Sequence, residues 1–167
     1  RRGIMQVLGI DPGVATTGYG LITQLPDGGI ETVKYGVIHT KAGISLPERL
    51  QMLYEELQNI LLLHQPQHAA VEKLFFQRNV TTAIAVGEAR GICLLALSQA
   101  HISIGEYTPL EVKQAVTGYG AADKRQVQVM VQTLLQLKML PKPDDAADAL
   151  AVAFCHMSHL RYQQAAL

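Results

Sequence analysis

Two carboxylates stand at positions where they could take part in metal-dependent chemistry. Asp11 follows the apolar run 5–10 and precedes Pro12-Gly13, and Glu72 ends the apolar run that begins at His68. Both acids thus come at the carboxyl end of an expected strand, the edge where α/β sheets place ligands. Each also has a simpler explanation. Aspartate before proline is typical of a type I turn, and a glutamate at a strand end is ordinarily solvated.

A second acidic pair, Asp145 and Asp148, falls in a segment with helical character. Residues three apart share one face of a helix, so these two carboxylates would lie side by side. Acidic residues near a helix N-terminus also complement the helix dipole, and Asp144 is a natural N-cap. Asp148, however, is surrounded by alanine, leucine and valine. A carboxylate on such a surface is costly unless something pairs it.

Together these four carboxylates predict a site for divalent cations. If they converge at one sheet edge, they repel one another and raise each other's pKa, and a cation removes this conflict. Oxygen ligands suit Mg²⁺ or Mn²⁺. Two such ions about 4 Å apart would activate a water and stabilise the leaving oxygen of a phosphodiester. His156 lies roughly 16 Å beyond Asp145 along the helix, too far to share the metal. We therefore expect His156 and His159 at a surface or interface.

The elements that position these residues begin with strands and continue as alternating strands and helices. We expect strands over 5–10, 17–25, 30–40, 68–72 and 102–107, and helices over 47–64, 81–99, 108–118, 123–137 and from 144 or 145 to about 160. Pro26-Asp27-Gly28-Gly29 is typical of a hairpin turn. This order predicts an α/β fold with a mixed sheet and helices on its faces.

Composition supports one folded domain over residues 1–167, with Arg1–Ile4 an upstream remnant if Met5 is the natural start. The chain has 167 residues, of which 49% are apolar and 17% are charged, which excludes disorder. Cys93 and Cys155 lie in apolar stretches and indicate a reducing compartment. No apolar run approaches the roughly 20 residues that span a bilayer, and no signal peptide is visible. We expect a soluble, cytoplasmic protein that makes no membrane contact.

An ordered set of motifs covers the chain from about Met5 to His156. The set comprises Leu8-Gly9-Ile10-Asp11-Pro12-Gly13, Thr17-Gly18-Tyr19-Gly20, Val71-Glu72 with Phe75-Phe76 and Asn79, Gly87-Glu88-Ala89-Arg90-Gly91, Val112-Lys113-Gln114, Gly118-Tyr119-Gly120 and Asp145-Ala146-Ala147-Asp148-Ala149-Leu150-Ala151. Each motif alone is weak, but the ordered set is specific. The chain resembles the RuvC family of Holliday-junction resolvases.

This resemblance implies an RNase H-like fold of the retroviral integrase superfamily, with a mixed five-stranded sheet and helices on both faces. It implies a homodimeric crossover junction endodeoxyribonuclease that makes paired nicks in four-way DNA junctions during recombination and repair. Two Mg²⁺ ions per subunit, for which Mn²⁺ can substitute, are the implied cofactors. The family's catalytic and metal-binding positions fall on Asp11, Glu72, Asp145 and Asp148. The RuvA–RuvB branch-migration complex is the implied partner, and the helix with Gly87 and Gly91 is our candidate for the dimer contact.

The resemblance also suggests residues that contact DNA. The family's aromatic residue beside the second acid falls on Phe75, which would stack on an unpaired base near the crossover, although a core phenylalanine is the alternative. Lys113 and Lys124 match basic positions near the family's active site and would contact phosphates or stabilise charge in the transition state. Lone helical lysines are otherwise usually solvated. Further candidates for phosphate contacts are Lys73, Arg78, Arg90 and Arg125.

Three other functions are alternatives to junction cleavage. An actin-like ATPase or sugar kinase also opens with a strand, an aspartate and a glycine turn, but it needs two such domains. Another RNase H-like nuclease could act on a different nucleic acid, and a non-catalytic module could retain the fold alone. Because all four acids are present and the match extends over nearly the whole chain, junction cleavage remains our prediction.

The net charge of zero first argues against a nucleic-acid substrate, since 14 basic residues balance 14 acidic ones. Five of the acids are Asp144 and the four proposed metal ligands. Without these five, 14 basic residues face 9 acidic ones. With divalent ions bound, the acidic cluster itself would attract phosphate. We therefore expect DNA binding to depend on the metal, or on a narrow basic rim, more than on a broad basic surface.

Overall fold

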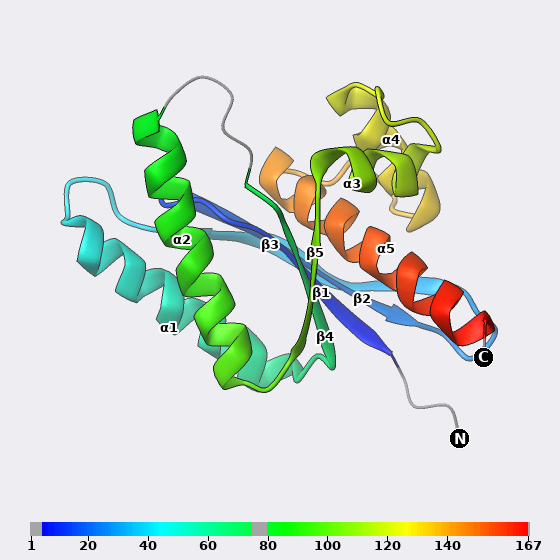
Figure 1. Cartoon of the computed structure of the whole chain (residues 1–167), viewed down its shortest axis with the longest axis horizontal. Coiled ribbons are helices and arrows are strands. Elements are labelled where there is room, and N and C mark those ends of the chain that lie inside the picture. Colours follow the sequence, from blue (N-terminus) through cyan, green and yellow to red (C-terminus); the bar gives the residue numbers. More distant parts are fainter. Residues whose placement is uncertain (1–4, 75–79, 167) are drawn as a thin grey trace.

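The computed structural model describes residues 5–74 and 80–166. Its strands are β1 (Gln6–Asp11), β2 (Thr16–Gln24), β3 (Ile30–His39), β4 (His68–Glu72) and β5 (Ser103–Tyr107). Its helices are α1 (Leu46–His64), α2 (Val80–Gln99), α3 (Pro109–Thr117), α4 (Lys124–Leu134) and α5 (Asp144–Ala165). The expected mixed five-stranded sheet with helices on both faces is confirmed (Figure 1).

The sheet brings the carboxyl ends of β1 and β4 to the same edge. Its strand order is β3-β2-β1-β4-β5, with β1 antiparallel to β2 and β2 antiparallel to β3. β1 and β4 are parallel, as are β4 and β5. Ile10 of β1 is paired with Val71 of β4. Asp11 and Glu72, the next residue on each strand, therefore end neighbouring strands side by side.

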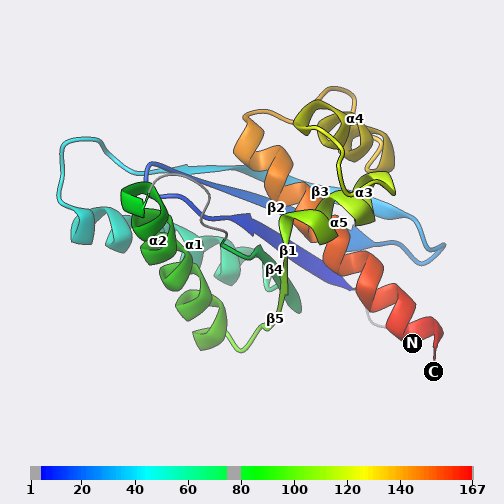
Figure 2. The same cartoon turned by 45° about the horizontal axis from the view of Figure 1, so that its top comes forward.

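Two hydrophobic clusters lie on opposite faces of the sheet. Leu8, Ile10 and Val71 point into the cluster beneath α1 and α2. Val7 and Ala70 point into the cluster beneath α3, α4 and α5. Figures 1 and 2 show these two helical layers with the sheet between them. Because side chains alternate along a strand, Asp11 and Glu72 fall on the same face as Val7 and Ala70, toward α5.

Glycines in β1 and β2 allow α5 to lie unusually close to the sheet. A Cβ atom at Gly18 would collide with the carbonyl oxygen of Asp145, and one at Gly9 would collide with that of Ala149. Gly18 is also the residue paired with Asp11 across β1 and β2. The first turn of α5 is thus seated directly beside the end of β1, which sets the position of its acidic residues.

Local signals predicted most of the helix ends. Thr108 caps α3 in a capping box with Glu111, as the sequence predicts, and Gly118 ends this helix in a left-handed conformation. Asp144 is not the N-cap that we expected. It is the first residue of α5, which follows Pro143, and its side chain accepts a hydrogen bond from Gln128 at 3.0 Å. The carboxylate thus pairs with α4 instead of capping its own helix.

The expectation that no segment is long and apolar enough for a bilayer is wrong for α2. This helix of 20 residues passes that test by length and composition. One such helix is weak evidence of a membrane span, because core helices of soluble proteins pass the same test. Cys93, Ala96 and Leu97 of α2 are buried, and the helix packs on α1. Its opposite face carries exposed apolar side chains.

Candidate active site

Asp11, Asp145 and Asp148 form a compact group of carboxylates at the edge of the sheet. Each offers one oxygen, and these three oxygens all lie within 4.8 Å of one another. Asp11 comes from the end of β1, and the other two come from the first turns of α5. Among the residues that the structure describes, this is the single group of three or more such side chains that could hold a metal ion.

The electrostatics of Asp11 favour a bound cation at this group. Burial, followed by the negative charges of Asp148, Asp145 and Glu72, raises the pKa of Asp11 from 3.8 to about 8. Burial is also the main cause of a raised pKa at Asp148. Carboxylates this close cannot all be ionised cheaply without a compensating positive charge. Hard oxygen donors in this arrangement fit a divalent cation such as Mg²⁺ or Mn²⁺.

Glu72 lies next to this group but outside the compact set of three. Burial and the charge of Asp148 raise its pKa, and the positive charge of Lys113 lowers it. Glu72 and Asp148 line one cavity of about 250 Å³, together with Lys113 and Lys124. The expected convergence of four carboxylates is therefore seen as three in direct proximity and a fourth that lines an adjoining cavity with Asp148.

Lys124 makes the direct ionic contacts in this cavity. Its Nζ lies 3.3 Å from Oδ2 of Asp148 and 3.4 Å from Oδ2 of Asp144. Burial alone would lower the pKa of Lys124, but the attraction of these two carboxylates outweighs it and raises this pKa. Lys124 therefore supplies one positive charge beside Asp148.

A cavity with acidic and basic walls at the carboxyl edge of an α/β sheet suits the hydrolysis of a phosphodiester, and comparison with known proteins agrees. The family model described as crossover junction endodeoxyribonuclease RuvC matches residues 7–156. The chain belongs to the RuvC family.

Curated RuvC proteins resemble the chain over nearly its whole length. The one from Syntrophomonas wolfei is 54% identical over 157 residues, covering 94% of this chain and 91% of the relative. The one from Caldicellulosiruptor saccharolyticus is 52% identical over 163 residues, covering 96% of this chain and 98% of the relative. Both are named crossover junction endodeoxyribonuclease RuvC.

Solved structures give the same result. Thermus thermophilus RuvC has a TM-score of 0.88 and 35% identity, with 95% of this chain and 97% of that chain covered. The complex of T. thermophilus RuvC with a Holliday junction substrate has a TM-score of 0.89 and 34% identity, with 95% and 96% covered. The yeast mitochondrial Holliday junction resolvase Ydc2 shares the fold, with a TM-score of 0.64 and 17% identity. The match covers 95% of this chain and 82% of the Ydc2 chain.

The other candidates for DNA contacts suggested by the RuvC resemblance lie in different surroundings. Lys73 is exposed immediately after Glu72. Arg125 lines a separate cavity on α4 that also includes Tyr119. Phe75 and Arg78 lie outside the described residues. Of these four, Lys73 alone borders the acidic edge in the described part of the chain.

Arg90 is not the free phosphate contact that we expected. Its Nε donates a hydrogen bond to the backbone carbonyl of Glu72 at 3.1 Å, and its guanidinium pairs with the carboxylate of Glu106. The side chain is only 17% exposed. Arg90 therefore holds the end of β4 in place, and sequence reasoning missed this role because the partner is a backbone group 18 residues away.

His156 also differs from expectation, because it is buried and not at a surface. Its side chain is 6% exposed, and its Nδ1 lies 2.6 Å from the hydroxyl of Tyr107. His159 is exposed, as expected, and its ring packs 4.8 Å from that of Tyr107. Helical periodicity placed His156 on the apolar face of α5, and this was the signal that could have revealed its burial.

Proposed function

We propose that this chain is a crossover junction endodeoxyribonuclease that resolves four-way (Holliday) DNA junctions by metal-dependent hydrolysis during recombination and repair. The observation that carries the proposal is the group of Asp11, Asp145 and Asp148 on the sheet edge, with oxygens within 4.8 Å of one another. It occurs in a chain of the RuvC family, and a T. thermophilus relative has been solved with a Holliday junction substrate.

In this proposal Asp11, Glu72, Asp145 and Asp148 are the catalytic and metal-binding residues. They would hold two Mg²⁺ ions, for which Mn²⁺ can substitute, with Asp11 and Asp148 at the centre and the other two completing the shell. The raised pKa of Asp11, caused by burial and neighbouring carboxylates, supports this assignment because bound cations relieve that repulsion. When bound, the ions would supply an activated water and stabilise the leaving oxygen.

Lys113 and Lys124 would act on the phosphate that enters the cavity. Both line it with Glu72 and Asp148, so a phosphate held there would lie within reach of two ammonium groups. Lys124 now pairs with Asp148. Metal binding at Asp148 would weaken that pairing and free Lys124 for the phosphate. Lys73, beside the cavity, and Arg125, on the outer side of α4, would contact the DNA backbone farther from the cut.

Phe75 and Arg78 complete the set of proposed DNA contacts. Both lie outside the described residues, and their assignment rests on the resemblance of the sequence alone. They follow Glu72 closely in the chain, so the segment that carries them starts at the acidic edge. Phe75 would stack on an unpaired base at the crossover.

The enzyme would act as a homodimer through α2. Val80, Ile84 and Leu95 are 70%, 54% and 49% exposed on this helix. A Cβ atom at Gly91, on the same face, would meet no atom within 4 Å, so this glycine leaves space for a second backbone to approach. A second copy of the chain fits this surface because a four-way junction requires two cuts, on strands of like polarity. A two-fold dimer supplies two equivalent active sites.

The RuvA–RuvB branch-migration complex is the expected partner at the junction. Because this work is done on the DNA of the cell, we expect the enzyme to act in the cytoplasm. The rival function as an actin-like ATPase or kinase fragment is not favoured, since the match to RuvC proteins covers 94% or more of this chain in two curated relatives.

The test compares cleavage of a mobile four-way junction, an immobile one and a linear duplex in the presence of Mg²⁺. We expect paired nicks in the mobile junction, no cutting of the duplex, and no activity without the metal. Asp11→Asn should abolish nicking and leave junction binding intact. Equal cutting of duplex, or of an RNA–DNA hybrid, would favour another RNase H-like nuclease, and an active Asp11→Asn enzyme would refute the catalytic assignment.

A further inference from the structure

Tyr107 occupies a position that connects three parts of the proposed active site. It is the last residue of β5 and is paired with Glu72 in the register of the sheet. Its carbonyl accepts a hydrogen bond of 2.7 Å from the backbone N–H of Lys73. The backbone of Tyr107 therefore borders the end of β4, where Glu72 enters the cavity.

The side chain of Tyr107 reaches across to α5. Its hydroxyl lies 2.6 Å from Nδ1 of His156, and the two rings are 5.6 Å apart between centroids. His156 is 6% exposed, and its other ring nitrogen, Nε2, has no hydrogen-bond partner among the described residues. Burial, and then the neighbouring His68 and His159, lower the pKa of His156 to about 4, so the ring is neutral near pH 7. The contact with Tyr107 is then its principal polar anchor.

The fold makes room for this contact. A Cβ atom at Gly105, two residues before Tyr107 on the same face of β5, would collide with the imidazole of His156. A glycine at this position leaves room for the imidazole beside the strand, where its Nδ1 meets the hydroxyl. The close fit of strand and ring indicates a specific, directional contact and not a loose one.

The chain beyond Tyr107 leads directly to Lys113. Thr108 caps α3, with Glu111 completing the capping box through hydrogen bonds of 2.7 and 3.1 Å. The cap makes the β5–α3 junction a rigid corner. A shift of Tyr107 therefore moves the first turns of α3, and with them Lys113, relative to Glu72 and Asp148 on the other walls of the cavity.

We propose that Tyr107 and His156 form a positioning pair, which ties the β5–α3 junction to α5 and so holds Lys113 in place beside Glu72. This inference rests on the proposed function, because it assigns Lys113 a part in the reaction. Neither member of the pair touches the substrate. The hydroxyl of Tyr107 acts through the position of Lys113, and a displacement of about 1 Å at such a group is enough to slow a reaction strongly.

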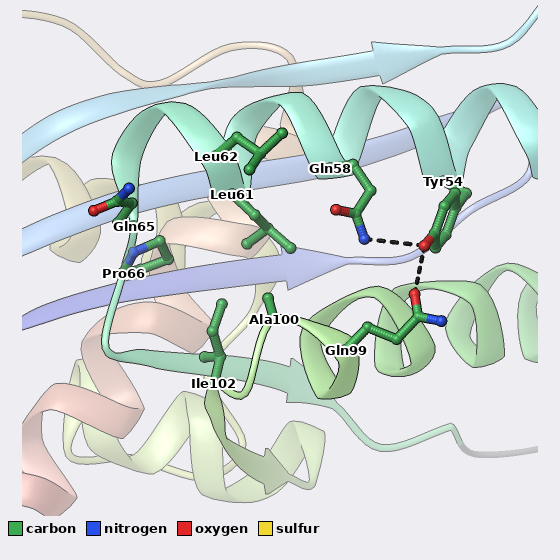
Figure 3. A pocket seen from close by; sticks show the side chains of 9 residues that line it. All are labelled: Tyr54, Gln58, Leu61, Leu62, Gln65, Pro66, Gln99, Ala100 and Ile102. Carbon is green, nitrogen blue, oxygen red and sulfur yellow. Dashed lines mark hydrogen bonds between the residues drawn. The ribbon is translucent and has the colours of Figure 1, made fainter.

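A matched control lies at the far edge of the sheet (Figure 3). The hydroxyl of Tyr54 on α1 accepts a hydrogen bond of 3.1 Å from Gln58 and donates one to Gln99 of α2. These residues line a cavity of about 620 Å³ with Pro66 and Ile102, which come just before β4 and β5 begin. Tyr54→Phe thus removes one hydroxyl between two elements, as Tyr107→Phe does, but at the edge opposite the acids.

The experiment measures the single-turnover cleavage of a mobile four-way junction at saturating Mg²⁺, and junction binding in EDTA. We expect Tyr107→Phe to slow cleavage about 10-fold with unchanged binding, and Tyr54→Phe to cleave at the normal rate. In a Lys113→Ala background, adding Tyr107→Phe should change the rate less than about twofold, because the position of an absent lysine no longer matters.

His156 provides a second, independent arm. His156→Asn keeps a hydrogen-bonding group near the position of Nδ1, and His156→Leu does not, so the first should cleave faster than the second. Equal rates for these two variants would overturn the proposal. So would independent effects of Tyr107→Phe and Lys113→Ala, or equal effects of the two tyrosine changes. A wild-type enzyme that fails to cut the junction would instead refute the proposed function, which keeps the two failures distinct.

Discussion

The ionisation of Asp11 should destabilise the metal-free protein as the pH rises. Its pKa is raised from 3.8 to about 8 by burial first and then by Asp148, Asp145 and Glu72. Between these two pH values the folded chain binds more protons than the unfolded chain. The contribution of Asp11 to stability is therefore full at and below about pH 4, falls as the pH rises toward 8, and becomes level above it. Buried His156, whose pKa is lowered to about 4, contributes the opposite trend below pH 6.5, so the effect of Asp11 is the difference between the wild type and a variant that cannot ionise at this position.

The size of this effect follows from the shift of about four pKa units. At about 1.4 kcal/mol per unit, full burial would make it between 5 and 6 kcal/mol. Asp11 retains some exposure to solvent, which screens its charge, so we expect a loss of about 2–3 kcal/mol between pH 5 and pH 8. Mg²⁺ that binds only the folded chain should restore this stability at pH 8.

The assay is urea denaturation in EDTA at pH 5, 6.5 and 8, repeated with Mg²⁺ in place of EDTA. Asp11→Asn cannot ionise, so the stability of the wild type relative to this variant should fall between pH 5 and pH 8, and the variant should respond little to Mg²⁺. At pH 8 in EDTA it should be more stable than the wild type. Asp27→Asn, in the exposed β2–β3 turn, makes the same change of charge and should behave as the wild type. A wild-type pH dependence in Asp11→Asn would refute the reasoning.

Two further predictions concern the seating of α5 and the dimer. Gly18→Ala would place a methyl group against the carbonyl of Asp145. We therefore expect a loss of at least about 2 kcal/mol of stability and weaker Mg²⁺ binding by calorimetry. The stability of the control Gly87→Ala in α2, whose added Cβ makes only an ordinary contact, should stay within about 1 kcal/mol of the wild type. Ile84→Glu should convert the proposed dimer to a monomer, as measured by light scattering. Leu62→Glu, which changes an exposed apolar residue on α1, should leave the dimer intact. A dimeric Ile84→Glu protein would exclude α2 as the dimer contact.

Local chemistry explains why so much of the fold was predictable. Several of the predicted features depend only on residues close together in the sequence. They are the capping box of Thr108 and Glu111, the hairpin turn around Asp27, and the apolar runs before Asp11 and Glu72. Such signals are present in the sequence whatever the rest of the chain does. The same is true of the acidic residues at strand ends, whose role as candidates for metal binding needed no knowledge of distant contacts.

Contacts between distant segments explain what was missed. Arg90 pairs with Glu106 and with the carbonyl of Glu72, and His156 is buried against Tyr107, 49 residues earlier. Neither partner is near in sequence, and several other partners would have been equally compatible with the pattern. Asp144 was expected to cap α5, but its side chain accepts a hydrogen bond from Gln128 of α4. This partner too is distant in the sequence.

The amino-acid sequence specified which residues could hold a metal, because carboxylates at strand ends and three apart on a helix are local facts. It did not specify that Asp145 and Asp148 come close to Asp11 while Glu72 stays outside this compact set. That depends on how closely α5 approaches the sheet, which is set by the absence of side chains at Gly9 and Gly18. The packing of a helix against a sheet depends on every side chain along their contact. Only the folded chain therefore shows how far apart the carboxylates of α5 and β1 lie.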